Sequence, residues 1–140
     1  MKEAVTYGLV FIGLAIIALV WPRSGTSSDN PVHVGNVRHI VDGDTLYLHG
    51  VERSIRVWGI DAPEQREKGY KAATDALSRL AYGKRLWCEQ VAIDRYDRIV
   101  AKCRLGDGRD IGEEMIKQGH AREYCRYSRN KYGTCKPRRR

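Results

Sequence analysis

A long uninterrupted run of apolar and small residues near the start of the chain constrains the fold most strongly, because it does not suit a water-exposed surface. The run covers residues 4–21 and contains no charged side chain. Its 18 residues are just enough for a helix to cross the hydrocarbon core of a bilayer, where only a helix satisfies its own backbone. Residues 24–31 have the composition of a linker. We therefore expect one folded domain at residues 32–135 and a basic tail at 136–140.

Residues 1–23 allow three interpretations. An uncleaved N-terminal membrane anchor is favoured, because no small-residue cleavage site of the A-x-A kind follows Trp21. Cleavage as a signal peptide is the alternative. A buried helix of a soluble domain is disfavoured, because the run is hydrophobic on every face. The domain is thus expected to be exported: membrane-anchored and facing the periplasm or exterior, or secreted if the segment is cleaved.

The even number of cysteines favours disulfides in an oxidising compartment. The four residues are Cys88, Cys103, Cys125 and Cys135. No closely spaced C-x-x-C pair is present, which disfavours zinc. In a hairpin centred on the turn at residues 94–97, Cys88 and Cys103 lie equally far from the centre and would face each other. Cys125 and Cys135 would then close a C-terminal loop, while four reduced thiols are the competing interpretation.

The net charge of +8 is concentrated at the C-terminus. Residues 1–119 hold 17 Lys and Arg against 16 Asp and Glu, a balance of +1. Residues 120–140 hold eight Lys and Arg against a single Glu, a balance of +7. Such a block attracts polyanions, either nucleic acid or anionic lipid, unless it is only a solvated tail. The 42% hydrophobic content excludes a wholly disordered chain.

Short β-branched runs separated by turn residues dominate the rest of the chain. They predict strands at residues 34–41, 45–48, 54–60, 85–93 and 99–105, with a short strand at 121–124. Apolar residues at helical spacing predict helices at residues 71–81 and 111–118. Five short strands interrupted by helices favour a mainly β, α+β fold. The expected architecture is a five-stranded, partly open OB-fold barrel with two packed helices.

Five charged residues near the predicted strand ends suggest chemistry on phosphate. Asp44 and Asp61 are short carboxylates on strands that would lie side by side, and such hard oxygen ligands suit Ca²⁺ or Mg²⁺. Glu64 lies three residues after Asp61 and would take a proton from an attacking water. Arg56 and Arg98 would grip phosphate oxygens through their planar guanidinium groups. Phosphodiester hydrolysis requires these parts.

Three segments of the sequence resemble the signature blocks of the staphylococcal nuclease (thermonuclease) family. They are Val41–Thr45 (VDGDT), Arg56–Glu64 (RVWGIDAPE) and Asp94–Arg98 (DRYDR). The resemblance covers roughly residues 34–127, with the blocks in the family's order. It implies an OB-fold barrel with packed helices and a Ca²⁺-dependent hydrolysis of DNA and RNA phosphodiesters.

The resemblance also implies a role for individual residues. The expected metal ligands are Asp44, Asp61 and the main-chain carbonyl of Ala62. The expected catalytic residues are Arg56, Glu64 and Arg98. The expected substrate-binding residues are Tyr96, at the 5′-phosphate end, and Tyr124. Tyr127 competes with Tyr124, because the register of the match is uncertain there.

Three departures from the family pattern bear on these roles. Ala62 stands where the best-known member has threonine, a change that a carbonyl ligand tolerates. Asp97 replaces a turn glycine; it tolerates left-handed geometry but is expected to lie beside Arg98 and weaken its grip on phosphate. Family members usually continue into a third helix, and here a Cys125–Cys135 bridge is expected to take its place.

The leading hypothesis is therefore an exported, membrane-tethered and monomeric nuclease that uses Ca²⁺ in preference to Mg²⁺. A non-catalytic OB-fold module that holds single-stranded nucleic acid is the alternative. It is disfavoured because all five charged site residues are retained. A third possibility is an envelope-anchored protein whose tail binds anionic lipid.

Overall fold

The computed structural model describes residues 30–136. The expected anchor or signal segment at residues 1–23 lies outside the described residues, as do nearly all of the linker and the last four residues of the tail. Among the helices of the described part, none has the length and apolar character needed to span a membrane.

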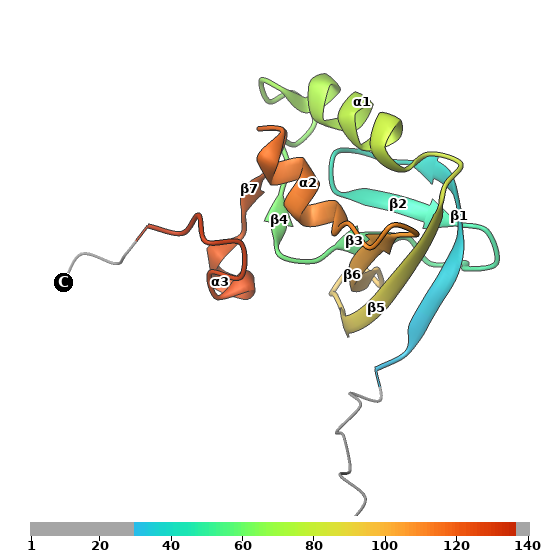
Figure 1. Ribbon diagram of the computed structural model, residues 1–140. Helices are drawn as coiled ribbons and strands as arrows, with labels where there is room; N and C mark the ends of the chain where they lie inside the picture. Colours follow the sequence, from blue (N-terminus) through green and yellow to red (C-terminus); the bar gives the residue numbers. More distant parts are fainter. Residues whose placement is uncertain (1–29, 137–140) are drawn as a thin grey trace, which may run out of the picture.

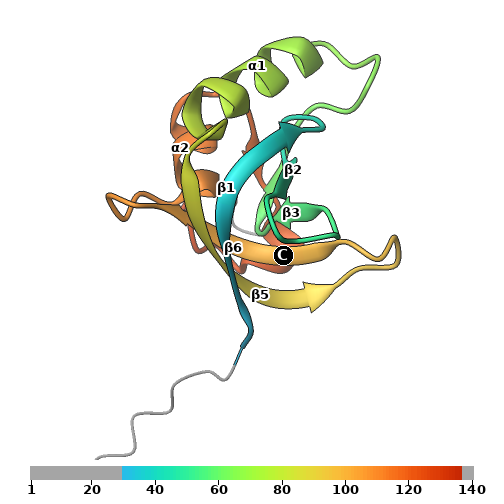
Figure 2. The same ribbon diagram turned by 90° about the vertical axis from the view of Figure 1, so that its right-hand side faces the viewer.

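Five strands close into a barrel, and two helices pack against it (Figures 1 and 2). The elements in chain order are β1 (Val32–Ile40), β2 (Thr45–Leu48), β3 (Ile55–Val57), β4 (Ile60–Asp61), α1 (Tyr70–Ala81), β5 (Arg85–Ile93), β6 (Ile99–Leu105), α2 (Ile111–Lys117), β7 (Arg122–Glu123) and α3 (Cys125–Ser128). The barrel order is β1-β2-β3-β6-β5. Only the β3–β6 pair is parallel among the barrel strands. The five-stranded barrel expected from the sequence is confirmed, although it is closed rather than partly open.

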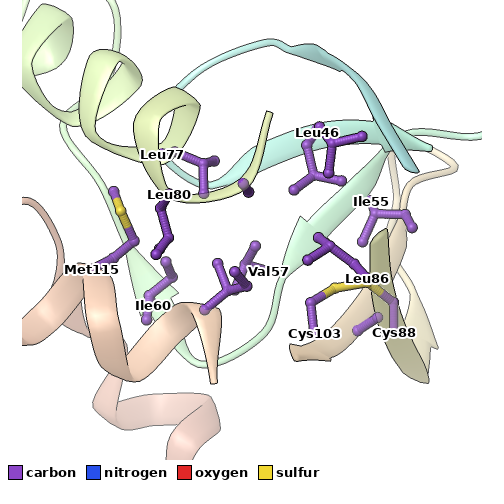
Figure 3. Packing of buried hydrophobic residues seen from close by; sticks show 14 of the residues in the cluster. Leu46, Ile55, Val57, Ile60, Leu77, Leu80, Leu86, Cys88, Cys103 and Met115 are labelled. Carbon is purple, nitrogen blue, oxygen red and sulfur yellow. A yellow bond between two sulfur atoms is a disulfide. The ribbon is translucent and has the colours of Figure 1, made fainter. Parts of the chain in front are cut away.

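The barrel interior is filled by alternate residues of each strand. Leu46, Ile55, Val57 and Leu86 are almost fully buried there (Figure 3). Helix α1 covers one end of the barrel and places Leu77 in the same cluster. This rigid interior fixes the outer wall, where the charged residues lie.

The β5–β6 hairpin has the register expected from its turn. Cys88 lies directly opposite Cys103, and the two form a disulfide inside the barrel (Figure 3). Cys125 and Cys135 form the second disulfide. Both expected bridges are therefore confirmed, and the interpretation of four reduced thiols is wrong. Disulfides of this kind are typical of oxidising, non-cytosolic compartments.

The strand expected at residues 54–60 is divided into two. β3 ends at Val57, and Gly59 adopts a φ of 79°, which turns the chain away from the barrel. A side chain on Gly59 would also meet the Tyr132 ring, with Cε2 at 3.1 Å from the added Cβ. Beyond this turn, β4 pairs with β7 in a separate antiparallel ribbon. The single-strand prediction was wrong because it treated one apolar run as one element.

The C-terminal segment lies beside the barrel, where Figure 1 shows β7 and α3 apart from the five strands. The four-residue helix α3 lies within the loop that the Cys125–Cys135 bridge closes. The expectation that the bridge alone would replace a third helix was therefore incomplete. A short helix and a disulfide together end the domain.

Candidate active site

The turn between β1 and β2 buries the first candidate metal ligand. The Asp44 amide donates to Asp42 Oδ1 at 3.0 Å, a local bond that shapes the turn. A Cβ on the intervening Gly43 would lie 2.7 Å from the Cβ atoms of Ala62 and Ala73, so only glycine permits this packing. The Asp44 side chain is thereby held at the barrel wall, with 5% of the residue exposed.

Asp44 and Asp61 converge on one arginine. Arg56 Nη2 lies 3.2 Å from Asp44 Oδ2 and 4.0 Å from Asp61 Oδ1. Arg56 Nη1 donates to the carbonyl oxygens of Val57 at 3.3 Å and Ile60 at 3.1 Å. The bend after β3 therefore presents these carbonyls to the guanidinium and fixes its position. The Asp44 and Asp61 carboxylates, which come from separate sequence motifs, thus both lie next to the guanidinium group of Arg56 on β3.

Burial makes the Asp44 carboxylate costly to ionise. Desolvation raises its pKa above the usual value, and the Arg56 charge, the Ala62 amide and the Thr45 hydroxyl only partly oppose this effect. The Ala62 amide donates to Asp44 Oδ2 at 3.3 Å, and Thr45 Oγ1 donates to Asp44 Oδ1 at 3.0 Å. A cation bound at this carboxylate would favour its ionised form.

Arg98 joins the same cluster through Thr45. Arg98 Nη1 lies 3.5 Å from Thr45 Oγ1, while its Nε donates to Asp94 Oδ2 at 2.7 Å. Partial burial acts to raise the Asp94 pKa, but hydrogen bonds from Arg98 and from the Tyr96 amide outweigh it, so the pKa is lowered. Asp94 thus remains ionised and holds Arg98 next to the Asp44 turn.

Asp97 does not lie against Arg98 as the sequence suggested. Its φ of 60° is the left-handed conformation expected for this turn. Its carboxylate instead accepts a hydrogen bond from Arg53 Nε at 3.0 Å. The carboxylate that pairs with Arg98 is Asp94. The contacts therefore give no reason to expect that Asp97 weakens the binding of phosphate by Arg98.

The tyrosines lie at two sides of the arginine pair. Tyr96 is 64% exposed, and its ring centroid lies 5.3 Å from Arg98 Cζ. The Tyr124 ring centroid lies 5.9 Å from Arg56 Cζ and packs edge-on against the Tyr127 ring, with centroids 4.8 Å apart. Tyr124 is therefore the tyrosine beside Arg56, and Tyr127 contacts the Tyr124 ring.

Glu64 and Ala62 lie on the segment that follows β4. The exposed Glu64 side chain makes no ion pair within residues 30–136, and its amide donates to Glu67 Oε2 at 2.8 Å. Ala62 is buried, and its amide is the group that contacts Asp44. The structure thus brings Asp44, Arg56, Asp61 and Arg98 together, and leaves the Glu64 carboxylate on a neighbouring exposed loop.

Arg122 belongs to this cluster although the sequence did not identify it. Its Nε and Nη2 donate to Asp61 Oδ2 at 2.8 and 2.6 Å, and these bonds raise the Arg122 pKa. The contact follows from the β4–β7 register, which places Arg122 opposite Asp61. No local motif marks this arginine; only the pairing of two distant short strands reveals it.

Glu123, the next residue of β7, is a buried carboxylate with four donors. It accepts hydrogen bonds from Ser128 Oγ at 2.6 Å, the Tyr132 amide at 3.0 Å, and the Thr134 amide and Oγ1, both at 2.9 Å. Among the described residues, Glu123, Cys125 and Cys135 form a group of possible metal ligands. We assign no metal there, because both sulfurs are in a disulfide and the carboxylate is already satisfied.

The fold and the site define a small disulfide-bridged barrel whose wall gathers carboxylates and arginines, an arrangement suited to phosphate chemistry. The family model described as Staphylococcal nuclease homologue matches residues 54–136, so the chain belongs to this family. The sequence-based assignment to a family of phosphodiester-hydrolysing nucleases is thereby confirmed.

Three relatives are similar over most of this chain. An uncharacterized endonuclease of Escherichia coli is 28% identical over 120 residues, which cover 84% of this chain and 75% of that protein. The probable endonuclease LCL3 of Phaeosphaeria nodorum is 33% identical over 124 residues, covering 80% of this chain and 42% of that protein. The succinoglycan biosynthesis protein ExoI of Rhizobium meliloti is 28% identical, over 79% of this chain and 61% of its own length.

Proposed function

We propose that this chain is a Ca²⁺-dependent nuclease that hydrolyses phosphodiester bonds of DNA and RNA. The observation that carries the proposal is the convergence of Asp44 and Asp61 on Arg56, with Arg98 linked to the same carboxylate through Thr45. Metal-binding and phosphate-binding groups from three sequence motifs therefore share one place on the barrel wall. Family membership and the names of the relatives support the same activity.

The donor set fits a hard divalent cation. Asp44 and Asp61 offer carboxylate oxygens, and we propose the Ala62 carbonyl as a further ligand. The cost of ionising the buried Asp44 would fall once a cation is bound. Ca²⁺ is preferred to Mg²⁺ because two carboxylates, a carbonyl and waters suit its larger and more flexible coordination shell. When bound, Ca²⁺ would polarise the phosphate as a Lewis acid.

Arg56 and Arg98 would hold the phosphate of the scissile bond. Arg56 is fixed by Asp44 and two carbonyls, and Arg98 is fixed by Asp94. Each guanidinium has five N–H donors, so these contacts leave others for phosphate oxygens. Both side chains would stabilise the negative charge that grows on those oxygens as the attacking oxygen approaches phosphorus.

Glu64 would act as the general base. Its carboxylate would accept a proton from the attacking water, whose oxygen bonds to phosphorus while the bond to the leaving oxygen breaks. The exposed loop gives the side chain freedom to approach a bound phosphate. Tyr96 and Tyr124, beside the two arginines, would flank the nucleotide on either side.

We further propose that the domain works outside the cytosol as a monomer. The two disulfides support an oxidising environment. Residues 1–23 would tether the domain to the membrane so that it faces the periplasm or exterior, or would direct secretion if they are cleaved.

A cleavage assay on the full chain tests the function. DNA and RNA should be degraded with Ca²⁺ and spared with chelator. Glu64→Gln should lower the rate by about 10²- to 10⁴-fold, as expected for loss of a general base. Glu52→Gln is the matched control, because it removes an exposed carboxylate in the segment between β2 and β3, outside the cluster. Rapid cleavage by Glu64→Gln would refute the base assignment, and binding without cleavage under any divalent metal would favour the non-catalytic OB-fold module.

A further inference from the structure

The outer face of β6 carries a row of cations that begins at the candidate active site. Side chains alternate along a strand, and Ala101 and Cys103 are buried in the barrel. Lys102 and Arg104 therefore project outward from the strand that starts directly after Arg98. Arg104 lies six residues beyond Arg98, which is about 20 Å along an extended strand.

Trp87 lies beside the far end of this row. It pairs with Arg104 across the β5–β6 ladder, so the two side chains share the outer face. Although large and apolar, Trp87 is 41% exposed. Its ring lies against Gly106, where an added Cβ would be 3.6 Å from Cζ3. The ring thus borders an open hollow of about 410 Å³.

Two guanidinium groups flank this tryptophan without a carboxylate partner. Arg85 Cζ lies 5.8 Å from the Trp87 ring centroid. Within residues 30–136, neither Arg85 nor Arg104 forms an ion pair. Arg109, on the rim of the same hollow, is by contrast neutralised by Asp107 at 2.8 Å and Glu114 at 3.3 Å. Arg85 and Arg104 are therefore available to an external anion.

A second tryptophan lies between this end and the candidate active site. The Trp58 amide donates to the Ala101 carbonyl at 2.8 Å, which places Trp58 beside β6. Lys102 Nζ lies 4.9 Å from the Trp58 ring centroid. The two indole rings therefore lie on opposite sides of β6, Trp58 beside Lys102 and Trp87 beside Arg104.

The surface is rigid because a covalent link lies beneath it. The Cys88–Cys103 disulfide joins β5 to β6 next to Trp87 and Arg104, and both sulfurs are buried. Two side chains on separate strands are therefore held in a fixed register. Binding to such a surface orders little additional structure, which lowers its entropic cost.

We propose that this face, formed by Arg85, Trp87, Arg104, Lys102 and Trp58 and called here the β6 track, is a second binding surface for single-stranded nucleic acid. It would hold the part of a strand that extends beyond the scissile phosphate, with phosphates on the cations and bases stacked on the indole rings. The proposal rests on the proposed nuclease function for its link to Arg98. A row of cations leading to Arg98, with an indole ring beside both Lys102 and Arg104, favours a continuous polyanion over a membrane surface.

The track predicts a dependence on substrate length. At 3.4 Å per nucleotide, 20 Å corresponds to roughly six nucleotides, so a trinucleotide at the active site would not reach Trp87. A 16-nucleotide strand would reach it. Changes in the track should therefore affect long strands and leave the cleavage of a trinucleotide unchanged.

The test measures the binding of fluorescent 16-nucleotide dT by the full chain in chelator, together with Ca²⁺-dependent cleavage of that strand and of dT trinucleotide. Trp87→Ala should weaken 16-mer binding by roughly 10- to 100-fold, and Trp87→Phe should restore most of it. Arg104→Gln should reduce the slope of log affinity against log salt by about 0.7. Tyr82→Ala and Arg79→Gln, which alter an exposed ring and an exposed cation away from the track, are the matched controls.

The outcomes separate the track from the proposed function. Weakened 16-mer binding with normal trinucleotide cleavage supports the track, and the same binding loss in a chain that cleaves nothing would support the track while refuting the nuclease. Unchanged 16-mer binding in both Trp87→Ala and Arg104→Gln would overturn the track while active cleavage preserved the nuclease. If the track variants instead lost binding to anionic phospholipid vesicles while keeping normal binding to dT, the surface would be assigned to lipid and the proposal would be overturned.

Discussion

Replacing Glu123 by glutamine should destabilise the protein by about 2–3 kcal/mol at neutral pH. Burial acts to raise the Glu123 pKa, but hydrogen bonds from Ser128, Tyr132 and Thr134 outweigh it and lower the pKa from 4.5 to about 2. Since each unit corresponds to about 1.4 kcal/mol, the ionised carboxylate contributes about 3 kcal/mol. Glutamine keeps one acceptor oxygen but turns an NH₂ group toward the remaining donors, so most of this contribution should be lost.

The pH dependence provides the sharper test. Because the pKa of Glu123 is lower in the folded state, its contribution is complete above the unfolded value of 4.5 and is lost as the pH falls toward about 2. Near pH 3 roughly half should remain. The wild-type protein and Glu123→Gln should therefore differ most above pH 5 and converge near pH 2. The difference between the two curves removes the effects of the other carboxylates.

Urea unfolding at several pH values under non-reducing conditions gives the required free energies of unfolding. Glu52→Gln serves as the control, since it replaces an exposed carboxylate that lies outside β7 and the C-terminal loop. A constant difference between wild type and Glu123→Gln from pH 7 to pH 2 would refute the reasoning, as would equal stability at pH 7. Either result would mean that the hydrogen-bonded carboxylate does not hold the C-terminal loop.

Two further substitutions test contacts that only the structure revealed. Arg122→Ala should raise the Ca²⁺ affinity by about two- to fivefold, measured by calorimetric titration. The reason is that the exposed Arg122–Asp61 ion pair, worth roughly 0.2–1 kcal/mol, must be broken before Asp61 can bind the metal. Equal or weaker Ca²⁺ binding by the variant would contradict this. Asp97→Gly should leave the cleavage rate within about twofold, because Asp97 pairs with Arg53 rather than Arg98; a large increase in steady-state rate would show that the Asp97 charge does reach the phosphate site.

The sequence predicted the hairpins of the barrel well because each hairpin's register is fixed by its own turn, whereas the β1–β5 and β3–β6 pairs that close the barrel join strands far apart in the chain. The turn at residues 94–97 fixes the β5–β6 register, so the position of Cys88 opposite Cys103 followed from symmetry about the turn. The apolar residues at helical spacing likewise predicted helix α1, and the same residues are the buried ones in the structure. The candidate site residues could be recognised from the sequence because they belong to three short motifs. These motifs lie at strand ends and turns that the barrel brings together.

A short strand was expected at residues 121–124, but its pairing with β4 escaped prediction because the two strands are each two residues long and lie some 60 residues apart. Neither is long enough to show a periodic pattern. The turn at Gly59 gave only a weak signal, since one glycine in an apolar run does not specify a change of direction. Arg122 and Glu123 were missed for the same reason, because their partners exist only after the ribbon has formed.

The ribbon also changes the meaning of the basic C-terminal block. The only acidic residue of this block, Glu123, is buried and accepts hydrogen bonds from within the C-terminal segment, and Arg122 is paired with Asp61. The exposed cations that remain include Arg126, Arg129 and Lys131, all within the loop that the Cys125–Cys135 bridge closes. Their charge is therefore held on a fixed loop that adjoins Tyr124 instead of being spread along a free tail. A polyanion attracted to this loop would arrive next to Arg56, so the electrostatic attraction and the proposed chemistry act at the same place on the barrel.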